Sequence, residues 1–396
     1  MKILAVNAGS SSLKFQLYEM PEEKVLISGV FERIGIDNSF YTIKLNGEKI
    51  RKEVELSNHS VAVGFLTKEL LENNIVDSLE EVKGVGHRAV QGADKISDSV
   101  IVNDYVEEVI EKYKVLAPLH NPASLTGIKA FKEFMPNATH VAVFDTAFHQ
   151  TMAEEQYMYA VPYEWYTDYA VRKYGMHGTS HRYVSKRINE ILGRETTKII
   201  VCHLGNGGSI SAVLNGKCID TSMGLTPNAG IVMGSRCGDI DASIIPYIME
   251  VTGMSIKEVD NMLNKKSGLL GISGVSSDSR DVEDGAKEGN KRCILAQNIY
   301  ARKVIEYIAK YYVLMGGCDA LCFTAGIGEN SIITRKNIID GLSALGIKLD
   351  EVANNVRGEE KLISAKDSSV PCYIIPTNEE VMIARDTYNL TEKENA

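Results

Sequence analysis

Two arginines and a histidine stand where carboxylate or phosphoryl chemistry could take place. Arg88 lies in the stretch GHRAVQG at the end of a predicted strand, and Arg236 lies in MGSRCGD. Glycine neighbours and few competing charges make each guanidinium a fork for a carboxylate or a phosphate, although a surface arginine is the plain alternative. His177 lies in another glycine-bracketed loop, YGMHGTSH, and is either functional or structural.

Two carboxylates complete this set. Asp145 follows the buried strand predicted at 141–144, and Glu379 opens the last predicted helix. Either could hold Mg²⁺, directly or through water. For Glu379 the alternative is compensation of the helix dipole, with Thr377 and Glu380 forming a capping box.

The turns that would hold a phosphate occur twice. An apolar strand, a Gly/Ser turn and a second strand follow each other at 3–18, with the turn AGSSS, and at 199–214, with the turn GNGGS. We expect these glycines to adopt φ > 0 and to let consecutive amide groups surround an anion. Two copies indicate two facing domains that grip one phosphorylated ligand. Lys14, beside the first turn, could neutralise a phosphoryl oxygen or be solvated.

Common nucleotide motifs are absent from both turns. Neither matches the P-loop string, each leads into a strand rather than a helix, and no G-x-G-x-x-G opens a helix. A third glycine-rich stretch, GIGEN at 326–330, follows the strand predicted at 320–324 and precedes a helix. Here a ribose or base could lie against the backbone. A plain strand-to-helix turn with Asn330 as N-cap is the alternative.

Composition limits the class of protein. The 396 residues are 44% hydrophobic and 24% charged, which supports sizeable cores. With 43 Lys+Arg against 52 Asp+Glu, the formal net charge is −9, which disfavours nucleic acids and anionic membranes as partners. The 7 cysteines show no metal-like spacing and indicate reduced thiols in a cytoplasmic protein. The first apolar stretch is too short for a signal-peptide core, and no run approaches a membrane helix.

Alternating strands and helices predict an α/β fold with mixed sheets and flanking helices. Asn103 is expected to open one helix, and Asn121-Pro122 to be the N-cap and first turn of another. The order of elements in the first half recurs in the second. We therefore expect an N-terminal α/β domain at 1–150, completed by the tail helix 379–396, and a C-terminal α/β domain at 151–378.

Four stretches together resemble the acetate kinase family. They are NAGSSSLK from Asn7, HLGNG from His203, FTAGIGEN from Phe323 and PTNEE from Pro376. The resemblance covers the whole chain in order. It implies the ribonuclease H-like fold of actin and the sugar kinases, with two domains of like topology around a central nucleotide cleft. It also implies a cytoplasmic homodimer that transfers the γ-phosphoryl group of ATP to acetate with Mg²⁺, or with Mn²⁺ in its place, giving ADP and acetyl phosphate.

The resemblance also implies roles for single residues. Those expected at the catalytic centre are His177, Arg236, Arg88 and Asp145. Arg88 would also bind acetate, whose methyl group would be walled by Val90, Leu119 and Pro227. Metal contacts would come from Asn7 and Glu379. The nucleotide would be bound by Ser10, Ser12, Lys14, His203, Leu204, Gly205, Asn206, Gly207, Asp278, Arg280, Gly326, Ile327, Gly328, Glu329 and Asn330.

Apart from Ala89 in place of Val, three positions depart from the family pattern. The family reads GHRVVHGG around the first arginine, but this chain has Gln91 and Ala93 in place of His and Gly, and Met176 stands where the family has Phe. These changes lie beside the carboxylate pocket and leave the choice of acid open, so a kinase for propionate or another short-chain acid is an alternative. A non-catalytic nucleotide switch on the same fold is a more distant one. Pyrophosphate as donor is disfavoured by the stretch 326–330.

Overall fold

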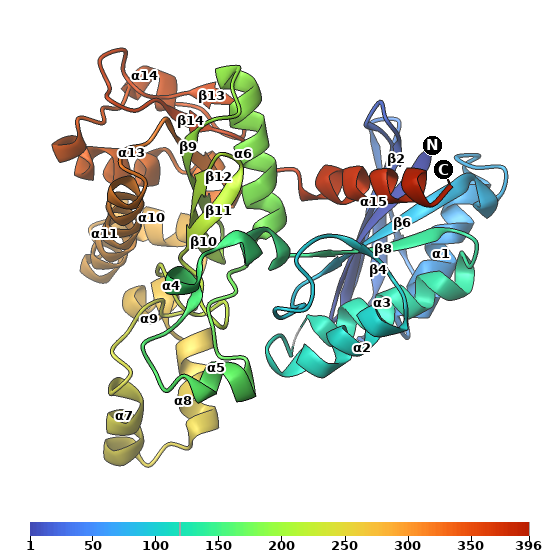
Figure 1. The fold of residues 1–396 in the computed structure, drawn as a ribbon, viewed down its shortest axis with the longest axis horizontal. Coiled ribbons are helices and arrows are strands. Elements are labelled where there is room, and N and C mark those ends of the chain that lie inside the picture. The colour runs from blue at the N-terminus through green and yellow to red at the C-terminus, as the bar shows by residue number, and fades with distance from the viewer. Residues whose placement is uncertain (119, 396) are drawn as a thin grey trace. The chain divides into compact units, whose positions relative to one another are not determined.

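A computed structural model describes residues 1–118 and 120–395 and divides the chain into two compact units. Unit 1 comprises 1–150 and 378–396, and unit 2 comprises 151–377 (Figure 1). Within the described residues, no helix has the length and apolar character needed to cross a bilayer.

Unit 1 is built on one mixed sheet with the strand order β5-β4-β3-β2-β1-β6-β8-β7. Its strands are β1 Lys2–Gly9, β2 Ser12–Glu19, β3 Lys24–Glu32, β4 Phe40–Leu45, β5 Glu48–Glu53, β6 Val82–Ala89, β7 Val100–Ile101 and β8 Thr139–Phe144. Its helices are α1 His59–Glu72, η1 Leu79–Glu81, α2 Asp104–Lys112, η2 Tyr113–Val115, α3 Asn121–Phe134, η3 Ala147–Thr151 and α15 Glu379–Asn395, of which η3 crosses into unit 2.

Helices cover both faces of this sheet. α3 packs on β1 and β6 with α1 and α2 beside it, while α15 lies along β1, β6 and β8 on the opposite face (Figure 1). The close approach of α15 depends on two glycines of β6. A Cβ on Gly84 would lie 2.8 Å from Thr387 Cγ2, and one on Gly86 would lie 2.2 Å from Thr387 Oγ1. The last helix of the chain is thus part of unit 1.

Unit 2 has the strand order β11-β10-β9-β12-β14-β13. Its strands are β9 Lys198–Leu204, β10 Gly208–Leu214, β11 Lys217–Thr221, β12 Ala320–Thr324, β13 Lys361–Leu362 and β14 Cys372–Ile374. Its helices are α4 Glu154–Tyr157, α5 Glu164–Tyr169, α6 Gly178–Leu192, α7 Ile244–Thr252, α8 Ile256–Lys265, α9 Gly268–Ser273, α10 Ser279–Lys287, α11 Lys291–Leu314, α12 Ala325–Asn330, α13 Ile332–Gly341, η4 Ser343–Leu345 and α14 Glu351–Asn354.

The two sheets share a topology. In unit 1, β3-β2-β1 form an antiparallel meander, and β6 and β8 continue parallel to β1. In unit 2, β11-β10-β9 form the same meander, and β12 and β14 continue parallel to β9. The predicted α/β fold with two like domains is therefore confirmed.

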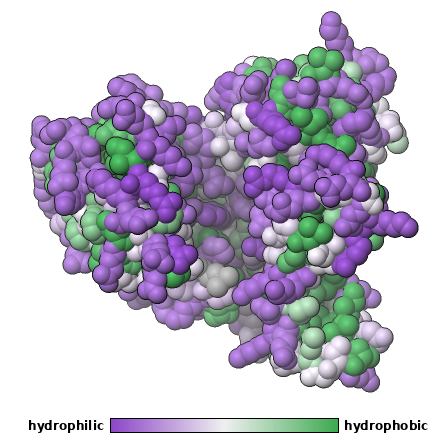
Figure 2. All heavy atoms as spheres, turned by 180° about the vertical axis from the view of Figure 1, so that it is seen from behind, coloured by the Kyte–Doolittle hydropathy of each residue, from purple (hydrophilic) through white to green (hydrophobic). Residues whose placement is uncertain are grey.

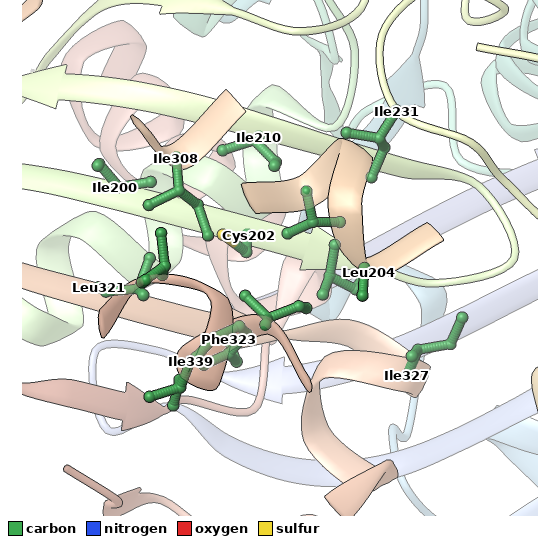
Figure 3. Close-up of a cluster of buried hydrophobic side chains, with 14 of the residues drawn as sticks. Ile200, Cys202, Leu204, Ile210, Ile231, Ile308, Leu321, Phe323, Ile327 and Ile339 are labelled. Carbon is green, nitrogen blue, oxygen red and sulfur yellow. The ribbon is translucent and has the colours of Figure 1, made fainter. Parts of the chain in front are cut away.

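Each sheet is anchored by its own apolar core. In unit 2, side chains of β9, β10 and β12 interlock with α11 and α13, as Figure 3 shows for Ile200, Ile210, Phe323, Ile308 and Ile339. Burying such aliphatic side chains stabilises the unit by about 1.5–3 kcal/mol each. All 7 cysteines are free thiols, and burial raises the pKa of several, Cys202 and Cys322 among them.

Candidate active site

The first Gly/Ser turn joins β1 and β2. Gly9 pairs with Ser12 at the end of the ladder, and His59 Nε2 lies 2.8 Å from the Gly9 carbonyl oxygen, which ties the turn to α1. A Cβ on Gly9 would lie 2.7 Å from Ser12 Oγ. Glycine is needed here for space. The expectation of φ > 0 is wrong for Gly9, and equally for Gly205, Gly207 and Gly208 of the second turn.

Next to this turn, the amide of Asn7 and the ammonium of Lys14 are cross-strand neighbours. Lys14 forms an ion pair with Glu380 of α15. Ser10, at the tip, is exposed, and Ser12 is half-buried. The predicted phosphate-side residues of unit 1 therefore gather around one turn.

Arg88 and Asp145 form a fork-to-fork ion pair. They stand at the carboxyl ends of the neighbouring parallel strands β6 and β8. Arg88 Nε lies 3.0 Å from Asp145 Oδ1, and Nη2 lies 2.6 Å from Oδ2. Asp145 is only 2% exposed, and its charge raises the pKa of Arg88. The aspartate thus fixes the direction of a permanently charged guanidinium.

Glu379, the first residue of α15, faces this pair. Burial raises the pKa of Glu379 to about 7, the charges of Asp145 and Glu380 act in the same direction, and Arg88 and Lys14 oppose them. The capping box of Thr377 and Glu380 does not form. Instead, Asn378 Oδ1 accepts a hydrogen bond from the Val381 amide at 3.1 Å. The Glu379 carboxylate is therefore not used for capping.

The loop after Arg88 holds two of the three family departures. Gln91 is fully buried, and its Oε1 accepts from the Ala93 amide at 2.8 Å. Ala93 has φ 52°, the left-handed region where glycine is favoured. Asn121 does not cap α3 as predicted, because its side chain exchanges hydrogen bonds with the Gln91 backbone at 3.0 and 2.9 Å. Val90 is buried there, and Leu119 lies outside the described residues.

The second Gly/Ser turn joins β9 and β10 of unit 2. The Gly205 amide donates to the Gly207 carbonyl at 3.1 Å. A Cβ on Gly207 would lie 3.3 Å from Arg236 Nη1 and 3.6 Å from His177 Nε2. The guanidinium and the imidazole therefore converge on the same spot beside the turn. Two nitrogen atoms that can donate hydrogen bonds beside one glycine are suited to an anion.

His177 precedes α6 with φ 59°, a left-handed conformation that is rare outside glycine. Its ring stacks on that of His203 at 4.1 Å between centroids, and its Nδ1 lies 2.9 Å from Ser209 Oγ. His203 Nδ1 lies 2.8 Å from Ser180 Oγ. A serine hydroxyl group thus contacts the Nδ1 atom of each ring. Met176, the third departure, is buried next to them.

Arg236 differs from Arg88 in having no acidic partner among the residues that the structure describes. Its Nη1 donates to the Pro227 carbonyl at 3.3 Å, and burial lowers its pKa. The loop that carries both residues is closed by Asp239, which accepts from the Gly230 amide at 2.8 Å and from Tyr307 Oη. A half-buried cation without a carboxylate gains most when an anion arrives.

A pocket of 430 Å³ opens beside the second turn within unit 2. It is lined by residues predicted to bind the nucleotide, Asn206, Asp278, Arg280, Gly326, Ile327 and Asn330. Gly326 has open space where a side chain would stand. Asp278 caps α10 and pairs with Arg280, whose Nε lies 3.0 Å from Asp278 Oδ1. The sequence did not indicate five further lining residues, Ser277, Ser279, Glu283, Ser331 and Arg357.

Other predicted residues serve the backbone of this region. Stretch 325–330 is itself the short helix α12, and Ser331, not Asn330, caps the next helix. Glu329 Oε1 accepts from the Ala325 amide at 2.8 Å and the Thr377 amide at 3.2 Å. The Leu204 side chain is in the core (Figure 3), so a ligand could meet only its backbone. Gly328 provides close packing, since a Cβ would lie 3.3 Å from the Phe323 carbonyl carbon.

No group of three or more His, Cys, Asp or Glu side chains suited to a metal occurs in 1–118 and 120–395. Mg²⁺ needs no such group, because it is usually held by one or two carboxylates together with waters and substrate phosphates. Glu379 fits this chemistry. Burial and two neighbouring carboxylates disfavour its charge, so a cation there would restore its ionised form.

Several residues of the site had no sequence signal of their own. Ser209 Oγ on β10 contacts His177 Nδ1, and His181 Nε2 contacts the same hydroxyl group from α6. Arg335, fully buried, donates to the Gly328 carbonyl at 3.0 Å and to Asn354 Oδ1 at 2.7 Å behind the pocket.

Comparisons with known proteins agree with these features. A family model described as the acetokinase family matches residues 2–385. An acetate kinase of Geobacillus sp. (strain WCH70) is 56% identical over 391 residues, which are 98% of either chain. Crystal structures of Porphyromonas gingivalis acetate kinase and of a Francisella tularensis propionate kinase are each 44% identical, with a TM-score of 0.93, over 98% of this chain and 99% of theirs. The chain belongs to the acetokinase family.

Proposed function

We propose that this protein transfers the γ-phosphoryl group of ATP to acetate, giving ADP and acetyl phosphate, and catalyses the reverse reaction. The observation that carries this proposal is the convergence of Arg236 Nη1 and His177 Nε2 beside Gly207, next to a pocket of nucleoside size. An anion at that spot would be neutralised by a cation that has no carboxylate partner among the described residues. Membership of the acetokinase family supports the same reaction.

Unit 2 would bind the nucleotide. The ribose and base would occupy the 430 Å³ pocket between α10 and α12, and the phosphates would extend to the turn at Asn206 and Gly207. Arg236 and His177 would donate hydrogen bonds to oxygens of the transferring phosphoryl group. The ring of His203, which stacks on that of His177, would hold the His177 ring in place. Charge that spreads over the phosphoryl oxygens in the transition state makes such donors effective.

Unit 1 would bind the acceptor. Acetate is ionised at neutral pH, so its oxygen needs no general base. The obstacle is repulsion between the carboxylate and the polyphosphate. Arg88, oriented by Asp145, would hold the carboxylate, with Val90 beside the methyl group. Ser10, Ser12 and Lys14 would contact phosphate oxygens from the first turn.

Asn7 and Glu379 would hold Mg²⁺ together with the phosphates of ATP, and Mn²⁺ could replace it. When bound, the ion supplies positive charge that offsets the charge of the phosphates. In this proposal, the chain contributes the amide oxygen of Asn7 and the carboxylate of Glu379, both in unit 1, as contacts for the ion. The neighbouring carboxylates of Asp145 and Glu380, which act to raise the pKa of Glu379, would favour a cation at this position.

Propionate is the second candidate acceptor. The Francisella propionate kinase and the Porphyromonas acetate kinase match this chain equally well in identity and TM-score. Gln91, Ala93 and Met176 lie beside or within the residues proposed for the carboxylate side. An apolar pocket distinguishes one methylene by only about 1–3 kcal/mol, so both acids could be used.

Trapping acyl phosphates as hydroxamates tests the function. The purified protein is given ATP and Mg²⁺ with acetate, propionate or butyrate, and ADP is measured in parallel. We expect stoichiometric hydroxamate and ADP with the highest kcat/KM for acetate. A higher value for propionate would select the alternative, and ADP release that ignores the acid would contradict the proposal. Replacing ATP by pyrophosphate should give no product.

We further propose that the enzyme is a cytoplasmic homodimer that pairs through α7 and α8. Helix α7 contains no buried residue although its sequence is IIPYIMEVT, and Tyr247 and Val251 are 62% and 57% exposed. Figure 2 shows apolar side chains gathered at this end of unit 2. A second copy would cover them.

Light scattering should give twice the chain mass, and Tyr247→Glu should give monomers. Free thiols support the reducing compartment.

A further inference from the structure

One hydroxyl group in unit 2 contacts two imidazoles. Ser209 Oγ lies 2.9 Å from His177 Nδ1 and 2.7 Å from His181 Nε2. Ser209 and His181 are fully buried, one on β10 and the other in the first turn of α6. His177 immediately precedes α6 and His181 lies in its first turn, so both rings contact Ser209 from the start of this helix.

Proton counting restricts this arrangement. A serine hydroxyl has one proton to donate, so Ser209 can donate to only one of the two rings. The other ring must then donate its own N–H to Ser209 Oγ. If Ser209 donates to His177 Nδ1, a neutral His177 carries its proton on Nε2. If it donates to His181, His177 carries a proton on Nδ1 and has an N–H at Nε2 only as a cation.

The position of His177 Nε2 decides between these states. It faces the site beside Gly207, where Arg236 already places a positive charge. A neutral ring that donates from Nε2 serves an incoming phosphoryl oxygen without adding a second cation beside this guanidinium. The required order is His181 Nε2–H to Ser209, Ser209 O–H to His177 Nδ1, and His177 Nε2–H to the ligand.

We propose that His181 and Ser209 are positioning residues that set the tautomer and the ring orientation of His177. This inference rests on the proposed function, because it assigns His177 Nε2 as a donor to the transferring group. Neither residue would touch the substrate. In other enzymes, a group that orients a catalytic histidine has a large effect on turnover without changing the fold.

The test combines kinetics with ¹⁵N NMR of histidine-labelled protein, in which His177 is assigned by its loss in His177→Gln. Ser209→Ala removes the relay. His181→Gln keeps an amide N–H where His181 Nε2 stands, and His181→Asn is its matched control, too short to reach Ser209. Ser180→Ala, which breaks the neighbouring contact with His203 Nδ1 at 2.8 Å, controls for loss of a similar buried hydrogen bond in the NMR spectra.

We expect wild-type His177 to be protonated on Nε2 and bare on Nδ1. Ser209→Ala and His181→Asn should mix the tautomers and lower kcat by about 10–100-fold, with the KM for acetate unchanged. His181→Gln should restore both the spectrum and kcat, and Ser180→Ala should leave the protonation pattern of His177 as in wild type.

A His177 that carries its proton on Nδ1, or that keeps its spectrum in Ser209→Ala, would overturn the inference. Those spectra need no turnover. If wild-type protein showed the expected tautomer but formed no acyl phosphate, the proposed function alone would fail.

Discussion

Units 1 and 2 share a strand order but hold their arginines differently. Arg88 of unit 1 is held by Asp145 through two hydrogen bonds, and Lys14 of the same unit is paired with Glu380. Arg236 of unit 2 donates to a carbonyl and has no acidic partner within the described residues. Two units of the same fold can therefore differ in whether a buried arginine is neutralised by a carboxylate. A paired arginine suits a fixed binding fork, whereas an arginine without a counter-ion suits charge that develops during the reaction.

The largest expected effect is on Arg236. Arg236→Ala should lower kcat by about 10²–10³-fold, because it removes a donor to the charge that develops on the phosphoryl oxygens. The melting temperature should be unchanged or slightly higher, since a desolvated cation is lost. Steady-state kinetics and thermal unfolding measure both, with Arg236→Lys as the control that keeps charge but not the fork. Wild-type turnover in Arg236→Ala would remove the contrast between the units.

In unit 1 the same kind of change should affect stability. Asp145→Asn leaves Arg88 without its counter-ion in a mostly buried position, which we expect to cost about 3 kcal/mol in the free energy of unfolding. Urea denaturation measures this value. Asp241→Asn, an exposed aspartate of unit 2, is the control. A loss below that of the control would mean that the pair contributes little to the fold.

Much of this contrast could not be predicted from the sequence. Apolar runs and turn residues sufficed for both hairpins and for placing Arg88 and Asp145 at strand ends. That the two side chains meet follows from β6 lying next to β8, which depends on long-range pairing. Glu283 and Arg357 reach the pocket from α10 and from the loop after α14. Asn121 had an N-cap sequence, but a tertiary contact with Gln91 uses its side chain instead.

Acidification should affect unit 1 through a buried histidine pair. His87 Nε2 lies 3.0 Å from His140 Nδ1, and burial lowers the pKa of both. The unfolded chain therefore binds more protons below the ordinary histidine pKa of about 6.5, so stability falls as pH drops through it. We expect the free energy of unfolding to fall as the pH drops from about 7 to about 5.

Replacing one ring tests the origin of that loss. His140→Gln removes a titrating ring and should flatten the dependence of the unfolding free energy on pH. An unchanged slope would assign the pH dependence to other groups.

A smaller loss of kcat is expected from a change in Tyr307, which contacts the loop that carries Arg236 but not Arg236 itself. Tyr307 Oη donates to Asp239, which closes the loop of Pro227 and Arg236. Tyr307→Phe removes this bond, so we expect kcat to fall several-fold, well short of the loss in Arg236→Ala. Tyr312→Phe on the same helix serves as the control. Equal kinetics in the two variants would show that the loop does not need Tyr307.

The smallest effect concerns the departure at Ala93. The left-handed backbone at Ala93 lowers the free energy of unfolding by about 1–2 kcal/mol. Glycine would remove this strain, but it would also raise the conformational entropy of the unfolded chain, which cancels part of the stabilisation. Ala93→Gly should therefore stabilise the protein by less than about 1 kcal/mol. Ala93→Val, which is β-branched, should destabilise it clearly. Thermal unfolding distinguishes the two, and equal melting temperatures would refute the strain argument.

Under the proposed function, the γ-phosphoryl group passes directly from ATP to the carboxylate, with no phosphorylated protein in between. Rapid-quench single-turnover experiments with [γ-³²P]ATP and acetate test it most directly. We expect label to pass into acetyl phosphate at the rate at which ATP disappears, with none attached to protein at any time. A labelled protein that forms first and then passes its phosphate to acetate would contradict it.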